Sequence, residues 1–409
     1  MKSNLQLFTS LIVLIFSINF LFPNCITNVN YKISHKNVIN KDSIPEILCG
    51  DEQTELYFPI LKNKKVAIVC NQSSVIKKTH LLDLLIKNKI NVVKVFAPEH
   101  GFRGNIDAGI IIENQIDGKT KVPVVSLFGK NKKPTVEQLK DVEIVLFDIQ
   151  DVGVRFFTYI STMHYVMEAC AENNKTFVVL DRPNPLGDYV SGPIMKEEFM
   201  SFIGIHKIPI VHGLTIGELA QMINGEEWLK DKKFCNLLVI KLKNYKHSDV
   251  WNLPIKPSPN LPNNISIRLY PSLCLFEATD VSIGRGTEFP FQVIGYPDTT
   301  FGNFNFIPKD IIGMQTNPIH EGKKCYGIDL RKNLLNEKFS FSYFIQFYNK
   351  FENKTKFLTR EKWFNMLVGN STVIKMIKEG KSEQEISKSY EKELNEYKTM
   401  RKKYLLYEE

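Results

Sequence analysis

The sequence predicts an α/β protein in which a Rossmann-like parallel sheet domain is followed by a second, smaller C-terminal α/β domain. Three apolar, strand-like runs, at 92–97, 144–147 and 177–180, each end abruptly in charged or polar residues. The segments between these runs carry helical patterns, which parallel strands need as crossover connections. Because the carboxyl ends of parallel strands meet at the edge where such sheets bind ligands, the sequence predicts a functional site there.

The elements are expected in a regular order along the chain. They are a strand at 66–69, a helix at 79–87, strands at 92–97, 122–127 and 144–147, a helix at 156–171 and a strand at 177–180. The first helix places four apolar side chains on one face behind a cap at Thr79. This alternation favours a right-handed, doubly wound sheet. The dinucleotide fingerprint GxGxxG is absent, so no nucleotide or other cofactor is expected.

The N-terminal part of the chain has the character of an export signal. Lys2 precedes a hydrophobic stretch over 5–22, so residues 1–25 are expected to be a signal peptide or an N-terminal anchor. Residues 26–50 are expected to form a tether, and two domains follow, over 51–235 and 236–409. The protein is therefore expected to be exported and to be periplasmic or membrane-anchored, contacting the membrane only through that anchor.

Composition and cysteine spacing exclude several kinds of site. The net charge of +9 comes from lysines spread through the chain, which form no focused stripe for nucleic acid and mildly favour an anionic substrate. The seven cysteines are widely separated and lack zinc-type spacing, so no metal site is expected. Cys70 and Cys170 lie inside apolar runs and are expected to be buried thiols. A disulfide could form after export, but the sequence does not select a pair.

The most informative motif reads FAPEHGFRG over residues 96–104. It places Glu99, His100 and Arg103 directly after the strand expected at 92–97. Taken alone, Glu99 and Arg103 would be interpreted as an ion pair on a loop. Similar clusters recur after two further strands, and this recurrence favours a site.

Those two later strands are also followed by polar clusters. The candidates are Asp148, Gln150, Asp151 and Arg155 after the run at 144–147, and Asp181, Arg182 and Asn184 after the run at 177–180. If the three runs are parallel neighbours, these side chains and Glu99 share one rim of the sheet.

The second half begins with the motif HGLTIGELA at His212. Thr215 and Glu218 have capping-box spacing, which predicts the start of a helix, and His212 just before it is a candidate substrate contact. The loop over 251–262, which contains Asn260, is too rich in proline to be a regular element. Long loops of this kind often carry function.

A second charged motif reads FEATDVSIGRGTEFPF over residues 276–291. Glycines on both sides of Arg285 allow the backbone to approach a ligand closely, and the guanidinium can bind a carboxylate with two hydrogen bonds. The alternative, equally weighted, is an internal ion pair of Arg285 with Glu277 or Glu288.

Six segments together resemble the NamZ-type (YbbC-like) exo-β-N-acetylmuramidases, glycosidases of bacterial peptidoglycan recycling. They are FAPEHGFRG, LFDIQDVGVRFFTYISTM, LDRPNPLG, HGLTIGELA, PSPNLP and FEATDVSIGRGTEFPF, in that order. The resemblance runs from about Lys64 to Tyr407. Ala278 and Asp280 depart from the family pattern, which favours glycine and asparagine at these positions.

The resemblance implies release of terminal N-acetylmuramic acid from the non-reducing ends of peptidoglycan fragments. It places the active site in a cleft between a catalytic Rossmann-like domain and the C-terminal domain, with Glu99 as the catalytic acid. Glycoside cleavage usually needs a second carboxylate, and Asp148, Asp151 and Glu277 qualify by type, while Tyr159 or a substrate-assisted route are alternatives. The lactyl carboxylate of the substrate would be bound by one or more arginines, for which the candidates are Arg103, Arg155, Arg182 and Arg285.

A second function class is a non-catalytic, two-lobed periplasmic protein that binds muropeptides or sugars. In such a protein the same carboxylates would serve only as hydrogen-bond acceptors. Hydrolysis of an ester or amide is a weaker alternative, since the chain lacks the GxSxG elbow of serine hydrolases.

Overall fold

We describe the fold from a computed structural model that covers residues 46–99, 101–102, 115–332 and 336–409. The expected signal or anchor at 1–25, His100 and Arg103 lie outside the described residues. Residues 46–409 form one compact unit. None of the helices in the described part of the chain combines the length and the hydrophobicity needed to span a bilayer.

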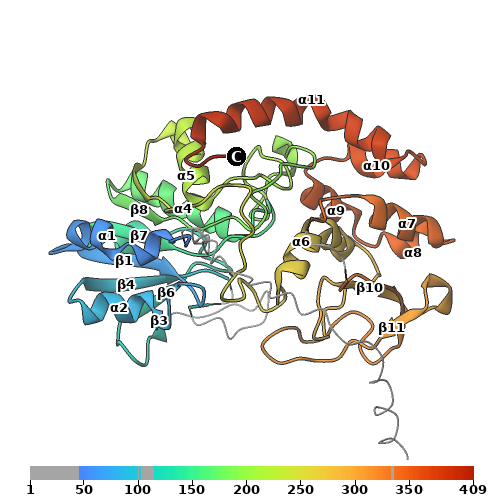
Figure 1. The fold of residues 1–409 in the computed structure, drawn as a ribbon, viewed down its shortest axis with the longest axis horizontal. Coiled ribbons are helices and arrows are strands. Elements are labelled where there is room, and N and C mark those ends of the chain that lie inside the picture. The colour runs from blue at the N-terminus through green and yellow to red at the C-terminus, as the bar shows by residue number, and fades with distance from the viewer. Residues whose placement is uncertain (1–45, 100, 103–114, 333–335) are drawn as a thin grey trace, which may run out of the picture. The chain divides into compact units, whose positions relative to one another are not determined.

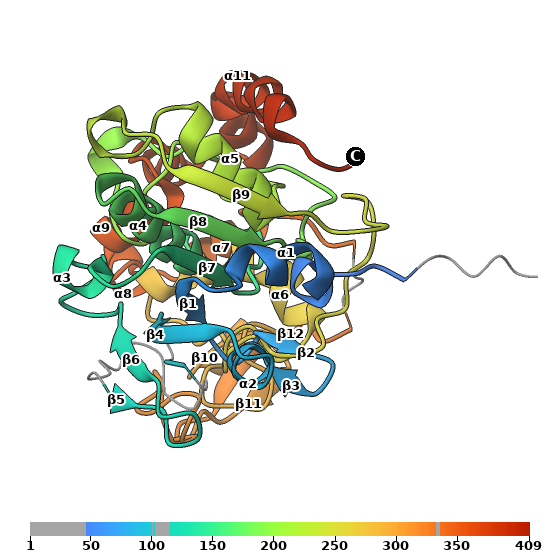
Figure 2. The same cartoon turned by 90° about the vertical axis from the view of Figure 1, so that its left-hand side faces the viewer.

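The larger sheet has seven strands, in the order β5-β6-β4-β1-β7-β8-β9. They are β1 (Lys65–Cys70), β4 (Asn91–Ala97), β5 (Gln115–Ile116), β6 (Pro123–Ser126), β7 (Ile144–Asp148), β8 (Thr176–Leu180) and β9 (Asn236–Ile240). All neighbours pair in parallel except the edge strand β5, which is antiparallel to β6. Figure 2 shows the strands from β5 at the lower edge to β9 at the upper edge. The parallel sheet predicted from the apolar runs is confirmed.

Helices cover both faces of this sheet, which explains why its strands are apolar at nearly every position. The helices of this part are α1 (Thr54–Leu61), α2 (Leu81–Lys87), α3 (Val136–Leu139), α4 (Tyr159–Glu172) and α5 (Ile216–Gly225). On β1, Val66 and Ile68 pack with α1 and α2, whereas Ala67 and Val69 belong to the core that includes α4 and α5. The two cores alternate along the strand, as the two-residue period of a strand requires.

The C-terminal part contains a small antiparallel sheet and a set of helices. The sheet has the order β10-β12-β11, formed by β10 (Val293–Tyr296), β11 (Phe304–Phe306) and β12 (Cys325–Asp329). The helices are α6 (Asn264–Leu273), α7 (Ser342–Lys350), α8 (Lys354–Phe357), α9 (Glu361–Val368), α10 (Thr372–Lys378) and α11 (Glu383–Arg401). Figure 1 shows α11 running from α10 back toward α5. The predicted second α/β region is confirmed.

Short elements complete the described chain. A two-stranded hairpin pairs β2 (Val75–Ile76) with β3 (Thr79–His80). The 3-10 helices are η1 (Gly50–Glu52), η2 (Glu197–Phe199), η3 (Lys230–Lys232), η4 (Cys274–Ala278), η5 (Thr299–Phe301) and η6 (Lys402–Tyr404).

The expected cap at Thr79 is wrong, because Thr79 is paired in the hairpin. The N-cap of α2 is His80, whose Nδ1 accepts a hydrogen bond from the backbone N–H of Leu82 at 3.2 Å. An imidazole nitrogen can serve in place of the usual hydroxyl because a cap requires only an acceptor near the free N–H groups.

Two expected boundaries also differ from the structure. The end of the expected tether is folded, since Leu48 pairs with Lys243 and the backbone N–H of Gly50 donates to the carbonyl of Asp181 at 2.8 Å. A Cβ atom on Gly50 would lie 2.5 Å from the Asp181 nitrogen, so this close approach needs glycine. The boundary expected after residue 235 would exclude β9, which pairs with β8 in the larger sheet.

Arg155 joins the two parts of the structure through backbone carbonyls. Its side chain is fully buried. Nη1 donates to the carbonyls of Pro193 at 2.8 Å and Ile208 at 2.6 Å, and Nη2 donates to those of Leu367 and Val368 at 2.8 Å each. The last two carbonyls end α9, where a helix has unsatisfied acceptors and a partial negative charge that favours a cation. The expectation that Arg155 contacts substrate is therefore corrected, since these four bonds are structural.

We expect Arg155→Met to lower the free energy of unfolding by roughly 3 to 5 kcal/mol, because four buried carbonyls lose a charged donor. Urea unfolding measures this change. Arg331→Met is the control, since Arg331 is 41% exposed and paired with Asp329, and it should cost about 1 kcal/mol or less. A loss below 1 kcal/mol for Arg155→Met would contradict the structural role.

Candidate active site

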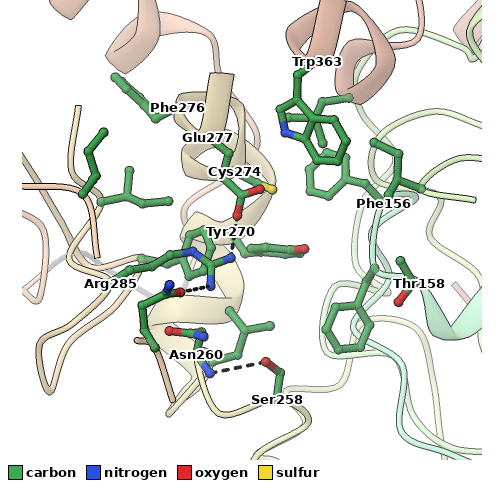
Figure 3. Close-up of a pocket in the computed structure, with 18 of the residues that line it drawn as sticks. Phe156, Thr158, Ser258, Asn260, Tyr270, Cys274, Phe276, Glu277, Arg285 and Trp363 are labelled. Carbon is green, nitrogen blue, oxygen red and sulfur yellow. Dashed lines mark hydrogen bonds and ion pairs between the residues drawn. The ribbon is translucent and has the colours of Figure 1, made fainter. Parts of the chain in front are cut away.

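A cavity of about 430 Å³ lies between side chains from the sheet domain and from the C-terminal part. Figure 3 shows Phe156 and Thr158 on one wall and Glu277, Arg285 and Asn260 on the opposite wall. The polar groups used below are Glu99, Thr158, Tyr159, Asn260, Glu277, Arg285 and Trp363. Five of these, Glu99, Tyr159, Asn260, Glu277 and Arg285, are candidates predicted from the sequence.

Glu99 follows β4 at the carboxyl edge of the sheet and is partly exposed. The hydroxyl of Thr158 donates a hydrogen bond to its Oε2 at 2.9 Å. Thr158 is the N-cap residue of α4, but its hydroxyl makes no capping bond to the helix. The hydroxyl that would ordinarily cap this helix instead holds a carboxylate in the cavity.

Tyr159, the first residue of α4, is buried beside Glu99. Its hydroxyl donates to the carbonyl of Pro257 at 3.2 Å. Burial, and then the charge of the Glu99 carboxylate, raise the pKa of Tyr159 well above its usual value. Tyr159 is therefore a protonated phenol at neutral pH, which argues against its alternative role as a nucleophile.

Glu277 and Arg285 form an ion pair in the wall of the cavity. Nη2 of Arg285 donates to Oε1 of Glu277, and Nη1 donates to Oε1 of Gln315 at 3.3 Å. The guanidinium lies 4.9 Å from the ring centroid of Phe291. Of the two alternatives for Arg285, the ion pair with Glu277 is formed, and both side chains still reach the cavity at 23% exposure.

The loop around Arg285 needs its two glycines. Gly284 and Gly286 both have φ of 78°, a conformation that other residues adopt at a cost. Glu288 is exposed in the same loop and does not line the cavity. The ion pair of Arg285 therefore uses Glu277 and not Glu288, and a substrate contact of Glu288 stays a prediction.

Asn260 lines the cavity and carries a buried acceptor without a partner. It is 2% exposed, and its Nδ2 donates to the carbonyl of Met314 at 2.9 Å. Its Oδ1 is buried and has no hydrogen-bond partner among the described residues. Because Nδ2 is fixed by a carbonyl, Oδ1 is held as an acceptor for a ligand hydroxyl or amide.

Asp148 and Arg182 do not reach the cavity and instead form a buried ion pair. Arg182 Nε donates to Asp148 Oδ1 at 2.6 Å, and Arg182 Nη2 donates to Asp51 Oδ2 at 2.6 Å. The two carboxylates are at most 1% exposed. The roles expected for Asp148 in catalysis and for Arg182 in substrate binding are corrected, because their charges neutralise each other inside the protein.

Four further candidates brace the loops at the carboxyl edge of the sheet. Asp151 accepts from the backbone N–H of Gly153 at 2.7 Å and lies 3.5 Å from His212 Nε2. Gln150 donates to the carbonyl of Pro183 at 2.8 Å, and Asn184 donates to that of Leu214 at 2.8 Å. All four are buried and none lines the cavity. The charged residues expected from the sequence to share one rim of the sheet therefore fall into two groups. Some line the cavity, and the others are buried and stabilise the loops.

One group of potential metal ligands occurs among the described residues. Donor atoms of Cys49, Asp51 and Glu52 lie within 4.8 Å of one another. Asp51 is already paired with Arg182, and Glu52 accepts from the backbone N–H of Cys49 at 2.8 Å. These two carboxylates are therefore already paired, one with Arg182 and the other with a backbone N–H group. The six described cysteines are buried and form no disulfide with one another, and burial is as expected for Cys70 and Cys170.

Comparisons with known proteins show the family of the chain. The N-terminal model of the exo-β-N-acetylmuramidase NamZ matches residues 66–265, and the C-terminal model matches residues 268–407. The peptidoglycan β-N-acetylmuramidase NamZ of Bacillus subtilis (strain 168) is 40% identical over 377 residues, which cover 85% of this chain and 88% of the relative. The chain belongs to the NamZ exo-β-N-acetylmuramidase family. The family resemblance and the enzyme class, a glycosidase, are confirmed.

Two crystal structures of DUF1343 family proteins from Bacteroides fragilis NCTC 9343 share the fold. One has a TM-score of 0.83 at 46% identity, and the other has a TM-score of 0.75 at 31% identity. In both cases the match covers 89% of this chain and 100% of the other.

Trp363, Thr158 and Gln315 line the cavity of this NamZ family member but were not predicted from the sequence. Trp363 lies in the C-terminal helices, where its spacing from Arg360 and Leu367 is that of an ordinary helix face. Thr158 falls within a motif that carries the resemblance, but its hydroxyl resembles that of any helix cap.

The buried carboxyl of Asp181 makes stability depend on pH. It accepts from the backbone N–H groups of Arg182 and Gly217 and from the hydroxyls of Thr215 and Tyr407, at 2.6 to 3.0 Å. Burial, reinforced by the neighbouring Glu218, raises the pKa of Asp181 to about 7. The predicted capping box of Thr215 and Glu218 is confirmed beside it.

Because the folded-state pKa of Asp181 lies above the value of about 4 in an unfolded chain, its stabilising contribution is complete below pH 4 and is lost as pH rises to about 7. Asp181→Asn keeps an acceptor for the two N–H groups and donates to hydroxyls that can rotate. We expect the stability of this variant relative to the unsubstituted protein to improve between pH 4 and 7, as measured by urea unfolding. Asp329→Asn is the control and should show a constant difference over this range, since hydrogen bonds from Arg331 lower the pKa of Asp329 below its usual value and so place its titration below pH 4. Parallel pH curves for Asp181→Asn and the unsubstituted protein would contradict this assignment.

Proposed function

We propose that the protein releases terminal N-acetylmuramic acid from the non-reducing ends of peptidoglycan fragments, with Glu99 as the general acid. Family membership and the name of the Bacillus subtilis relative support the substrate class. The observation that carries the proposal is the placement of Glu99 in a cavity whose opposite wall holds a second carboxylate, Glu277. The non-catalytic sugar-binding alternative is not favoured, because it gives no reason for two facing carboxylates.

The cavity supports an exo-acting enzyme. Its volume of about 430 Å³ lies in the lower part of the range usual for small-molecule sites, and it suits one sugar ring better than a long chain of sugars. A terminal sugar would occupy the cavity and the rest of the fragment would leave through its opening.

Glycoside cleavage requires a proton for the departing oxygen and a second group that stabilises or attacks the anomeric carbon. Glu99 is held by the hydroxyl of Thr158 at one oxygen, Oε2, so its carboxyl group has a fixed orientation in the cavity. Of the three candidate partners, Glu277 lines the cavity, whereas Asp148 and Asp151 are buried elsewhere. We therefore assign Glu277 to the second role.

Arg285 is the arginine best placed to bind the lactyl carboxylate that distinguishes N-acetylmuramic acid. Among the described candidates, Arg155 and Arg182 are buried and bonded to acceptors outside the cavity, whereas Arg285 lines the cavity. Its guanidinium has five N–H donors, of which Glu277 and Gln315 each receive one. A carboxylate on the sugar would occupy donors that remain.

Export remains part of the proposal. The hydrophobic N-terminal segment 1–25 would direct the protein to the periplasm or hold it at the membrane, where peptidoglycan fragments arise. Fractionation of cells with N-terminal sequencing of the protein checks this, and recovery from the cytosol with Met1 intact would refute it.

We expect Glu99→Gln to reduce turnover of natural fragments by roughly two to four orders of magnitude, the usual contribution of general acid catalysis. A substrate whose leaving group needs no proton should lose much less. Steady-state kinetics on both substrates measure the difference, and Glu137→Gln, at an exposed helical site, is the matched control. Full activity of Glu99→Gln on natural fragments would assign the acid to another residue, and unfolding of the variant would show that Glu99 is structural.

We expect Arg285→Lys to reduce the preference for a chromogenic N-acetylmuramide over the matching N-acetylglucosaminide by roughly 30-fold, because lysine cannot bind a carboxylate with two parallel bonds. The ratio of kcat/KM values is the readout, since it cancels any loss caused by the weakened pair with Glu277. Equal preference in variant and unsubstituted protein would place the lactyl contact elsewhere.

A further inference from the structure

Trp363 of helix α9 lines the cavity and carries an unpartnered hydrogen-bond donor. Nε1 of Trp363 is buried and has no acceptor among the described residues, although the ring lines the cavity. Figure 3 shows the indole at one end of the cavity, with its nitrogen on the side that carries Glu277. An indole nitrogen can only donate, so it needs an acceptor that the protein itself does not supply.

The position of this indole is fixed by contacts at both ends of α9. Arg360, at the N-cap position, donates from Nη2 to the carbonyl of Glu277. At the other end, the carbonyl of Leu367 accepts from Arg155 at 2.8 Å. Arg360, Trp363 and Leu367 occupy one face of the helix, and all three line the cavity. The N–H is therefore held in place before any ligand binds.

The surroundings of the indole specify the kind of acceptor. Apolar side chains that line the same cavity include Phe156, Ile203 and Leu367. The nitrogen also lies on the side of the Glu277 carboxylate, which would repel an anionic acceptor, whereas a neutral carbonyl carrying a methyl group would gain contact with the apolar side chains. A buried N–H left without a partner is unfavourable, and binding of such a carbonyl would remove that cost.

We infer that Trp363 determines specificity by donating its indole N–H to the carbonyl of the 2-acetamido group of the sugar in the cavity. This inference rests on the proposed function and extends it to a second substituent of the sugar. Arg285 would bind the lactyl group at C3, and Trp363 would bind the acyl group at C2. A sugar with a free amine at C2 offers no carbonyl to the indole.

The test compares the binding of N-acetylmuramic acid and muramic acid, which differ only in the acetyl group. Trp363→Phe keeps an aromatic ring and removes the N–H. We expect it to weaken the binding of N-acetylmuramic acid about tenfold, as loss of one buried hydrogen bond predicts, and to leave the binding of muramic acid unchanged. Titration calorimetry measures both dissociation constants without requiring turnover.

Trp251→Phe is the matched control, because the Trp251 indole N–H is also buried and unpartnered but does not line the cavity. It should leave both dissociation constants unchanged. If Trp363→Phe does not fold, Trp363→Tyr makes the same comparison with a different ring.

Equal losses for the two sugars, no loss for either, or no binding of N-acetylmuramic acid to the unsubstituted protein would overturn the inference. The proposed function is tested separately by cleavage of an N-acetylmuramide by the unsubstituted protein. Cleavage together with unchanged binding by Trp363→Phe would reject the role of Trp363 and leave the proposed function standing.

Discussion

The buried guanidinium of Arg155 is the interaction on which the cavity depends most directly. It lies in the loop between β7 and α4, and its bonds to the carbonyls of Leu367 and Val368 attach the end of α9 to that loop. Phe156, Thr158 and Tyr159 follow Arg155 on one wall of the cavity, and α9 contributes Trp363 to the cavity. A cation satisfied by backbone carbonyls is suited to this task, because it holds two chain segments without requiring a particular side chain on either.

The carboxyl edge of the sheet shows why charged motifs are an incomplete guide to a site. Strands buried on both faces end in loops whose backbone N–H and C=O groups are also buried and must be paired. Asp151, Asn184 and Asp181 satisfy that requirement through bonds to backbone N–H or C=O groups. These polar residues are therefore present in the motifs because buried loop groups need hydrogen-bond partners, not because they contact a substrate. Glu99 differs in position, because it lines the cavity, where it accepts a hydrogen bond from the hydroxyl of Thr158.

The fold could be predicted because burial of strands and helices produces local patterns of apolar residues in the sequence. Continuous apolar runs and helical spacing predicted the parallel sheet, and the capping box at Thr215 predicted the start of α5. The division of the polar residues could not be predicted, since it depends on partners distant in sequence. Asp148 pairs with Arg182, and the same guanidinium also binds Asp51, which comes from a segment that precedes the first strand. Trp363 carries no signal in the sequence, because a tryptophan on an amphipathic helix is ordinarily part of the core.

Unsatisfied polar atoms become informative only in combination with a cavity. Buried side-chain atoms without partners occur at several places in the described chain, and Trp251 shows that an orphaned indole N–H alone does not indicate a ligand. Trp363 Nε1 and Asn260 Oδ1 differ because both belong to residues that line one cavity with two carboxylates and an arginine. A donor-only group and a fixed acceptor in one cavity are complementary to a sugar whose substituents carry both carbonyl and hydroxyl groups. The residues that line this cavity therefore carry unpaired groups of the kinds with which such a substrate would form hydrogen bonds.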